Sequence, residues 1–191
     1  MLLTGIVEVD ETYVGGKEKN KSKAKRAANR AKNEATGKLH AHANPSNNKI
    51  PVLGILERNG QVRVQPMAAP TKSVLLPLLA ANISKDAMVV TDGLRSYQGL
   101  GSTYKLHVVV NHANDEWVNG EFSTNNIEGF WSIFKRGIIG VYHFTSPKHL
   151  HRYCDEFSYR YNNRKTDSVE KFAKAISEVT KARITYQTLT K

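Results

Sequence analysis

The sequence has 191 residues, of which 40% are hydrophobic and 24% charged, so a wholly disordered chain is excluded and one domain over residues 1–191 is expected. Its 28 Lys and Arg against 17 Asp and Glu give a net charge of +11, which favours a polyanionic partner such as a nucleic acid. The single cysteine, Cys154, excludes an intrachain disulfide and a cysteine-rich zinc site. No stretch approaches the roughly 20 apolar residues of a membrane span, so we expect a cytoplasmic protein without a membrane partner.

The N-terminal part predicts one strand followed by a basic insertion. Residues 5–14 alternate, and this pattern puts Val7, Val9, Glu11 and Tyr13 on one face and Ile6, Glu8, Asp10 and Thr12 on the other. Residues 17–49 hold ten Lys or Arg and two Glu, a local charge of +8, with almost no apolar periodicity. They predict a mobile insertion or a pair of loosely packed helices that contacts phosphates. The candidate contacts are Lys17, Lys19, Lys21, Lys23, Lys25, Arg26, Arg30 and Lys32.

The middle of the chain predicts more strands around one helix. We expect strands at 50–57 and 61–67 joined by an Asn59-Gly60 turn, a helix at 71–83, and strands at 87–90 and 105–110. The run at 87–90 is short and wholly apolar, as in a strand buried on both faces. Asp92 should therefore lie at the carboxyl end of a central strand.

Three helices are predicted after residue 123, and the last two of them form a C-terminal helical part at about 146–180. The first spans 124–136, the second begins at Ser146-Pro147, and the third spans 167–179. Their expected buried residues are Ile127, Phe130, Trp131 and Phe134 in the first, Leu150, Tyr153, Cys154, Phe157 and Tyr161 in the second, and Val169, Phe172, Ile176 and Val179 in the third. The element order predicts an α/β fold with a mixed sheet flanked by helices.

Three carboxylates lie where such a fold brings elements together: Asp10 in the first strand, Asp92 after the buried strand and Glu128 in the helix at 124–136. Hydrolysis or transfer of a phosphodiester with two divalent ions needs carboxylates that converge from different elements. On the same helix, Asn125, Glu128, Ser132 and Lys135 are spaced by three, four and three, so they form one polar stripe. Lys135 is then well placed to bind a phosphate, with Arg136 beside it.

Each of these residues also has a structural explanation. Asp10 could be a solvated strand residue, Asp92-Gly93 a turn, and Glu128 the partner of Asn125 in a capping box. Lys135 and Arg136 would be favoured at a helix C-terminus whatever the function. His112 and His143 show no spacing typical of a metal site and remain only candidate neighbours of an active site.

Several motifs together resemble a known family. They are 7–16 (VEVDETYVGG), 90–93 (VTDG), 110–112 (VNH), 124–132 (TNNIEGFWS) with Lys135-Arg136-Gly137, 146–150 (SPKHL), 155–157 (DEF) and 160–162 (RYN). In this order they resemble the ISXO-two-like branch of DDE-type insertion-sequence transposases. The resemblance implies an RNase H-like fold, a catalytic and metal-binding triad of Asp10, Asp92 and Glu128, assistance from Lys135, and two Mg²⁺ or Mn²⁺ ions. It also implies cleavage and strand transfer of DNA in a bacterial or archaeal nucleoid, element ends and target DNA as partners, and a homo-oligomer in the active complex.

Two departures from the family pattern leave alternatives open. Some members have Asn at the third triad position, so Asn125 or Asn126 could take the role given to Glu128. Complete members usually carry an N-terminal DNA-binding region, and nothing precedes Met1 here, so we expect a catalytic-domain fragment, a truncated copy or part of a split system. The rival functions are a host nuclease with an RNase H-like fold and a basic nucleic-acid-binding protein without catalysis.

Overall fold

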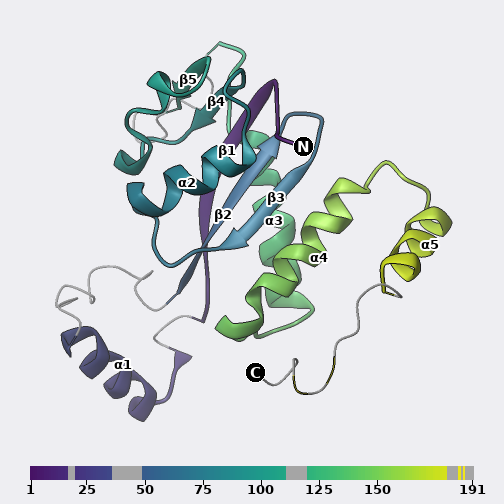
Figure 1. The fold of residues 1–191 in the computed structure, drawn as a ribbon. Coiled ribbons are helices and arrows are strands. Elements are labelled where there is room, and N and C mark those ends of the chain that lie inside the picture. The colour runs from purple at the N-terminus through teal and green to yellow at the C-terminus, as the bar shows by residue number, and fades with distance from the viewer. Residues whose placement is uncertain (17–19, 36–48, 111–119, 180–184, 186, 188–191) are drawn as a thin grey trace.

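The computed structural model describes residues 1–16, 20–35, 49–110, 120–179, 185 and 187 (Figure 1). Its centre is a five-stranded sheet in the order β3-β2-β1-β4-β5. These strands are β1 (Ile6–Val14), β2 (Ile50–Glu57), β3 (Val62–Pro66), β4 (Met88–Thr91) and β5 (Leu106–Val109). The strand β1 is antiparallel to β2 and parallel to β4, so the sheet is mixed. The predicted α/β fold with helices on a mixed sheet is confirmed.

The hairpin between β2 and β3 forms where the sequence predicts it. Asn59 has a φ of 63°, the left-handed conformation that asparagine tolerates in a tight turn. Six consecutive residues of β2, Pro51–Leu56, are buried, because both faces of the sheet are covered by helices.

One face of the sheet packs against α2 (Lys72–Asn82) and the two short 3₁₀ turns that follow β4, η2 (Arg95–Tyr97) and η3 (Leu100–Ser102). Its core holds Val7 and Val9 from β1, Leu75 and Leu79 from α2, and Tyr97. Odd-numbered β1 residues face this side, as the alternation predicts.

The other face packs against α3 (Asn125–Gly140) and α4 (Leu150–Asn162). The predicted apolar faces of both helices are confirmed, with Ile127, Phe130, Trp131, Phe134, Leu150, Cys154 and Phe157 buried. The other two expected core residues of α4, Tyr153 and Tyr161, are only partly buried and pack against this cluster. A Cβ on Gly137 would come within 2.1 Å of the Phe157 ring, so a glycine is needed where the two helices approach. Helix α3 extends four residues beyond the predicted end at Arg136, because Gly137 lies in this contact and does not end the helix.

The start of α4 differs from the prediction. Pro147–His149 form a 3₁₀ turn, η5, and the α-helix begins at Leu150. The Ser146 hydroxyl makes no cap hydrogen bond and is one of the buried polar atoms without a partner among the described residues.

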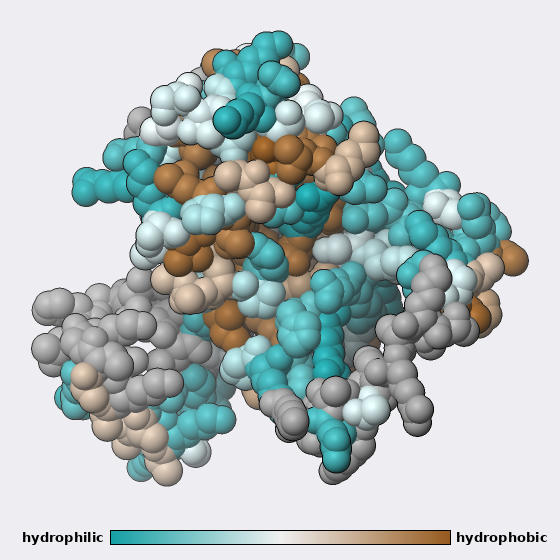
Figure 2. Space-filling model, viewed as in Figure 1, coloured by the Kyte–Doolittle hydropathy of each residue, from teal (hydrophilic) through white to brown (hydrophobic). Residues whose placement is uncertain are grey.

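The prediction that the apolar stripe of α5 (Ser168–Val179) points inward is wrong. Val169, Phe172 and Ile176 are 76%, 69% and 49% exposed. Figure 2 shows apolar side chains at the outer edge of the molecule where α5 lies. Helical spacing shows which residues share a face, but it does not show whether another element covers that face.

The basic insertion contains the helix α1 (Lys23–Ala35), and its residues 36–48 lie outside the described residues. Its described side chains are mostly exposed, and Arg30 pairs with Glu34 at 3.0 Å. Within the described part of the chain, no helix combines the length and the apolar character that a bilayer crossing requires.

Candidate active site

A pocket of about 380 Å³ opens where β4 ends beside β1. Its lining residues come from β1, the end of β4 and α3: Asp10, Glu11, Thr12, Asp92, Thr124, Glu128, Trp131, Ser132 and Lys135. The pocket therefore holds all three carboxylates of the predicted triad and the predicted lysine.

Strand pairing brings the two aspartates to the pocket. Val9 is the partner of Thr91 in the parallel pair of β1 and β4, so Asp10 and Asp92 are the next residues along the two strands. Because β4 ends at Thr91, β1 has no β4 partner from Asp10 onward. The open edge of β1 then lets side chains from both of its faces line the same pocket.

The helix α3 supplies the other residues of this site. Glu128, Ser132 and Lys135 lie on one stripe and all line the pocket, as their spacing predicts. Asn125 and Asn126 are exposed and are not among the lining residues, so Glu128 is the one of the three third-position candidates that lines the pocket.

The Asp10 carboxylate is largely buried and surrounded by negative charge. Its pKa is raised from 3.8 to about 6, mainly by burial, next by repulsion from the Asp92 carboxylate, and to a smaller extent by Glu128. The indole Nε1 of Trp131 donates a hydrogen bond to Asp10 Oδ2 at 3.0 Å and lowers the pKa in part. This clustering of mutually repelling carboxylates is typical of functional sites.

Glu11 is a fourth carboxylate of the pocket and was missed by the sequence analysis. Burial raises its pKa to about 7, although the Tyr97 hydroxyl donates to its Oε2 at 2.6 Å and lowers the pKa. Strict alternation assigns Glu11 to the face opposite Asp10. One signal in the sequence could have identified Glu11. The alternating segment of β1 has ten residues and the apolar run of β4 has only four, so the end of β1 has no partner on that side and its edge is open.

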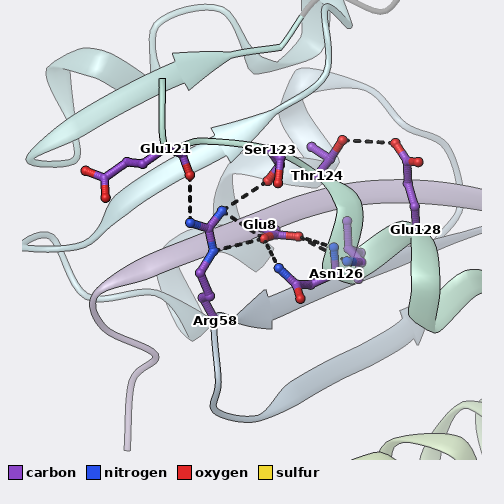
Figure 3. A network of polar contacts seen from close by, with 8 residues as sticks. Glu8, Arg58, Glu121, Ser123, Thr124, Asn126 and Glu128 are labelled. Carbon is purple, nitrogen blue, oxygen red and sulfur yellow. Dashed lines mark hydrogen bonds and ion pairs between the residues drawn. The ribbon is translucent and has the colours of Figure 1, made fainter. Parts of the chain in front are cut away.

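A third carboxylate of β1, Glu8, holds the start of α3 (Figure 3). Glu8 is fully buried, and its Oε2 accepts hydrogen bonds from the backbone N–H groups of Asn126 and Ile127, both at 3.0 Å. The Asn126 amide donates to Glu8 Oε1 at 2.7 Å, and the Arg58 guanidinium donates to the same oxygen from Nε and Nη2. The negative charge of Glu8 thus satisfies the unpaired amides at the helix N-terminus.

The same network leads directly to Glu128. Arg58 also donates to the carbonyl oxygens of Glu121 at 2.8 Å and Ser123 at 3.4 Å, which fixes the chain just before α3. The Thr124 hydroxyl then donates to Glu128 Oε1 at 3.0 Å. The alternative of a capping box between Asn125 and Glu128 does not hold, because Thr124 and not Asn125 is the N-cap of α3. Glu8 of β1 instead accepts hydrogen bonds from the N-terminal amides of the helix.

Asp10 and Glu8 together attach β1 to α3 at two points. The step from Glu8 to Asp10 advances about 6.6 Å along the strand, and the step from Ile127 to Trp131 advances about 6.0 Å along the helix. The two steps are nearly equal, so both hydrogen bonds can form at once. Gly54 of β2, the register partner of Asp10, lies under Trp131 and makes this approach possible.

Gly54→Ala is expected to lower the free energy of unfolding by about 1–3 kcal/mol, the typical cost of overpacking. A Cβ at this position would lie 2.5 Å from the Trp131 ring and 2.8 Å from Ile127, so the indole must move and lose its hydrogen bond to Asp10. Chemical denaturation and Trp131 fluorescence measure the two effects. Gly101→Ala is the control, because its nearest neighbour would be 3.9 Å away, and equal effects of both substitutions would contradict the close contact.

The remaining candidates lie elsewhere or outside the described residues. Arg136 is exposed and does not line the pocket, and His143 is exposed with its Nδ1 3.1 Å from the Ile139 carbonyl oxygen. In α1, Lys21 precedes the helix, and Lys23, Lys25, Arg26 and Arg30 belong to it or its first turn. Lys17, Lys19 and His112 lie outside the described residues, as does the side chain of Lys32.

The carboxylates do not form a ready-made metal site in this structure. Across residues 1–16, 20–35, 49–110 and 120–179, no group of three or more His, Cys, Asp or Glu side chains is arranged to hold an ion. Each triad carboxylate accepts a hydrogen bond instead: Asp10 from Trp131, Asp92 from the Leu94 N–H at 3.0 Å, and Glu128 from Thr124.

Comparison with known proteins identifies the family. Residues 2–162 match the family model described as the ISXO2-like transposase domain. A protein from Halobacterium salinarum, described as an uncharacterized protein in transposable element ISH50, is 32% identical over 137 residues, which cover 70% of this chain and 45% of that protein. An uncharacterized transposase-like protein from Haemophilus influenzae is 29% identical over 96 residues, 50% of this chain and 76% of that protein. The chain spans less than half of the Halobacterium relative, and it belongs to the ISXO2-like transposase family.

Proposed function

We propose that the chain cleaves DNA strands and transfers them by metal-dependent phosphoryl transfer, as the catalytic part of an insertion-sequence transposase. One observation carries this proposal. Asp10, Asp92, Glu128 and Lys135, chosen from spacing and family resemblance, come from three different elements and line one pocket. Carboxylates that converge beside a cation are what two-metal phosphodiester chemistry requires.

The donor set fits Mg²⁺ or Mn²⁺, which prefer carboxylate oxygens. The raised pKa of Asp10 supports this fit, since repulsion from Asp92 and Glu128 is relieved by a bound cation. A cation has to share or displace the three hydrogen bonds described above. When bound, the ions would activate water or a DNA 3′-hydroxyl and stabilise the leaving oxygen.

The protein's own residues have distinct roles in this proposal. Asp10, Asp92 and Glu128 hold the ions, Trp131 orients Asp10, and Thr124 orients Glu128. Lys135 binds the phosphate next to the scissile bond through its ammonium group. Positioning contributes much of the rate in phosphoryl transfer. The hydrogen bonds that hold α3 on β1 would therefore contribute to the rate by keeping Glu128 and Lys135 in place beside Asp10.

The function is tested with a DNA duplex that carries a candidate element end. In single-turnover reactions with Mg²⁺ or Mn²⁺, we expect cleavage that leaves a 3′-hydroxyl, followed by joining of that end to target DNA. Cleavage without joining would favour a host nuclease. Binding without cleavage in any divalent metal would reject the catalytic proposal in favour of a binding protein. Element ends, target DNA and a second copy of the chain are the proposed partners.

We further propose that α1 contacts the DNA backbone. Replacing Lys23, Lys25 and Arg26 by Gln should weaken binding equally for all sequences and flatten the dependence of log K on log salt by about 0.9 per lost phosphate contact. Titrations of labelled duplexes at several salt concentrations measure the slope. Lys85→Gln with Lys105→Gln, which removes two cations elsewhere, is the control, since both residues are exposed and precede β4 and β5, at the end of those strands away from Asp92. An unchanged slope in the α1 variant would show that α1 is a solvated helix that does not contact DNA.

A further inference from the structure

The segment that carries Asp92 is attached to β1 by a hydrogen bond on the face opposite α3. Asp92 follows β4, its Oδ1 accepts the Leu94 N–H at 3.0 Å, and the Leu94 carbonyl accepts the Tyr97 N–H at 3.0 Å. The Tyr97 hydroxyl returns to β1 and donates to Glu11 Oε2 at 2.6 Å. The segment that contains Asp92 is therefore joined to β1 on both sides: by the β1–β4 strand pairing before Asp92 and by the hydrogen bond from Tyr97 to Glu11 after it.

The Tyr97 hydroxyl is not explained by packing alone. Its ring is only 1% exposed and belongs to the apolar core with Val7, Val9 and Leu100, where a phenylalanine ring would fill the same space. A buried hydroxyl costs free energy unless it is hydrogen-bonded, and its partner here is a carboxylate that lines the pocket. Short hydrogen bonds from a hydroxyl to an ionised oxygen are among the stronger ones.

Glu11 is also surrounded by the charges of the site. Asp92 and Asp10 both act on Glu11 as nearby negative groups, so the carboxylate would be repelled from the pocket without a donor to hold it. Tyr97 supplies that donor from the segment that follows Asp92. The strand β1 thus carries one anchor for each of the other two triad residues: Glu8 holds the helix that bears Glu128, and Glu11 holds the segment that bears Asp92.

We propose that Glu11 and Tyr97 are a positioning pair for Asp92, whose hydrogen bond sets where this carboxylate lies relative to Asp10. The proposal rests on the function proposed above and assigns two residues beyond the triad and Lys135. Partners that orient metal ligands typically change metal affinity or activity by about 10–100-fold when they are removed. Their loss should therefore appear first as weaker cation binding.

The test uses Trp131 as a reporter, since its indole donates to Asp10. The chain has two tryptophans, and Trp117→Phe leaves Trp131 as the only one. Mn²⁺ is titrated against this protein and against its Tyr97→Phe, Glu11→Gln and Glu11→Asp variants. Tyr104→Phe is the matched control, because Tyr104 is a buried tyrosine of the same core cluster that does not line the pocket.

We expect Tyr97→Phe and Glu11→Asp to raise the half-saturating Mn²⁺ concentration about 10-fold or more and to slow cleavage at low Mn²⁺. Saturating Mn²⁺ should restore most of the rate, with DNA binding unchanged. Glu11→Gln keeps an oxygen that can accept from the Tyr97 hydroxyl, so it should lose less Mn²⁺ affinity than the other two variants.

Two results would overturn the proposal. The first is a half-saturating Mn²⁺ concentration for Tyr97→Phe and Glu11→Asp equal to that of Tyr104→Phe. The second is a larger loss of Mn²⁺ affinity in Glu11→Gln than in Tyr97→Phe, which would make Glu11 a direct ligand. A parent protein that shows no response to Mn²⁺ and no cleavage would instead reject the proposed function itself, and the pair with it.

Discussion

Asp10→Asn should abolish strand cleavage and at the same time make the metal-free protein more stable at pH 8. A metal ion contributes several kcal/mol of charge stabilisation in the transition state, and about 4 kcal/mol corresponds to a loss of about 10³-fold in rate. Asp92→Asn and Glu128→Gln should have comparable effects on cleavage. The gain in stability follows from the repulsion and burial that raise the pKa of Asp10.

The dependence on pH has a definite sign. The pKa of Asp10 is about 6 in the folded protein and 3.8 for the unperturbed group, so the folded state binds its proton more tightly. Stability from this residue is complete below pH 4 and is lost as the pH rises through 6. The shift corresponds to about 2–3 kcal/mol at pH 8, and asparagine avoids this cost because it carries no charge.

Urea unfolding in EDTA at pH 4 and pH 8 measures the difference between Asp10→Asn and the parent protein. We expect the variant to be more stable at pH 8 and nearly equal to the parent at pH 4. Glu11 is present in both proteins, and because the Asp10 charge contributes to raising its pKa to about 7, the loss of that charge in Asp10→Asn adds to the gain in stability at pH 8. Asp86→Asn is the control, because Asp86 is exposed and precedes β4 at the far end from the pocket. An equal difference at both pH values would show that the Asp10 carboxylate is not under strain.

The sequence was sufficient to predict the five strands and to select Asp10, Asp92, Glu128 and Lys135, which all line the pocket. Alternation in residues 5–14 placed Asp10 on the face that α3 covers, and the apolar run before Asp92 placed it at a strand end. Both inferences depend on local periodicity, which the backbone geometry enforces. The family motifs added the choice of Glu128, which spacing alone left open to a capping role.

Features that depend on contacts between distant segments were missed. Glu8 was given no role from the sequence, yet it is fully buried because Arg58 and the first turn of α3, about 50 and 118 residues away, supply its partners. Glu11 reaches the pocket only because β4 is shorter than β1. The exposed stripe of α5 was assigned to the core because periodicity does not identify a packing partner.

The length of α3 changes the argument about Lys135. With a helix ending at Arg136, as the sequence predicts, the helix dipole would account for two cations in the last turn. The helix ends at Gly140, and its last turn holds no basic residue. The dipole effect falls off within one turn, so it no longer explains Lys135, whereas Arg136 lies outside the pocket that Lys135 lines.

Lys135→Ala should therefore reduce cleavage of bound DNA by about 10²-fold or more, because a misplaced phosphate loses most of the benefit of orientation. The free energy of unfolding should change by less than about 1 kcal/mol, since Lys135 is exposed. Single-turnover cleavage of pre-bound DNA at saturating Mg²⁺ measures the rate, and thermal unfolding is recorded alongside. Lys135→Arg keeps the charge and should recover part of the activity. Arg136→Ala, which removes the neighbouring exposed cation, is the matched control and should cleave at nearly the parent rate. Parent-like cleavage by Lys135→Ala would remove this residue from the active site, and a parallel loss of stability would assign it to the fold.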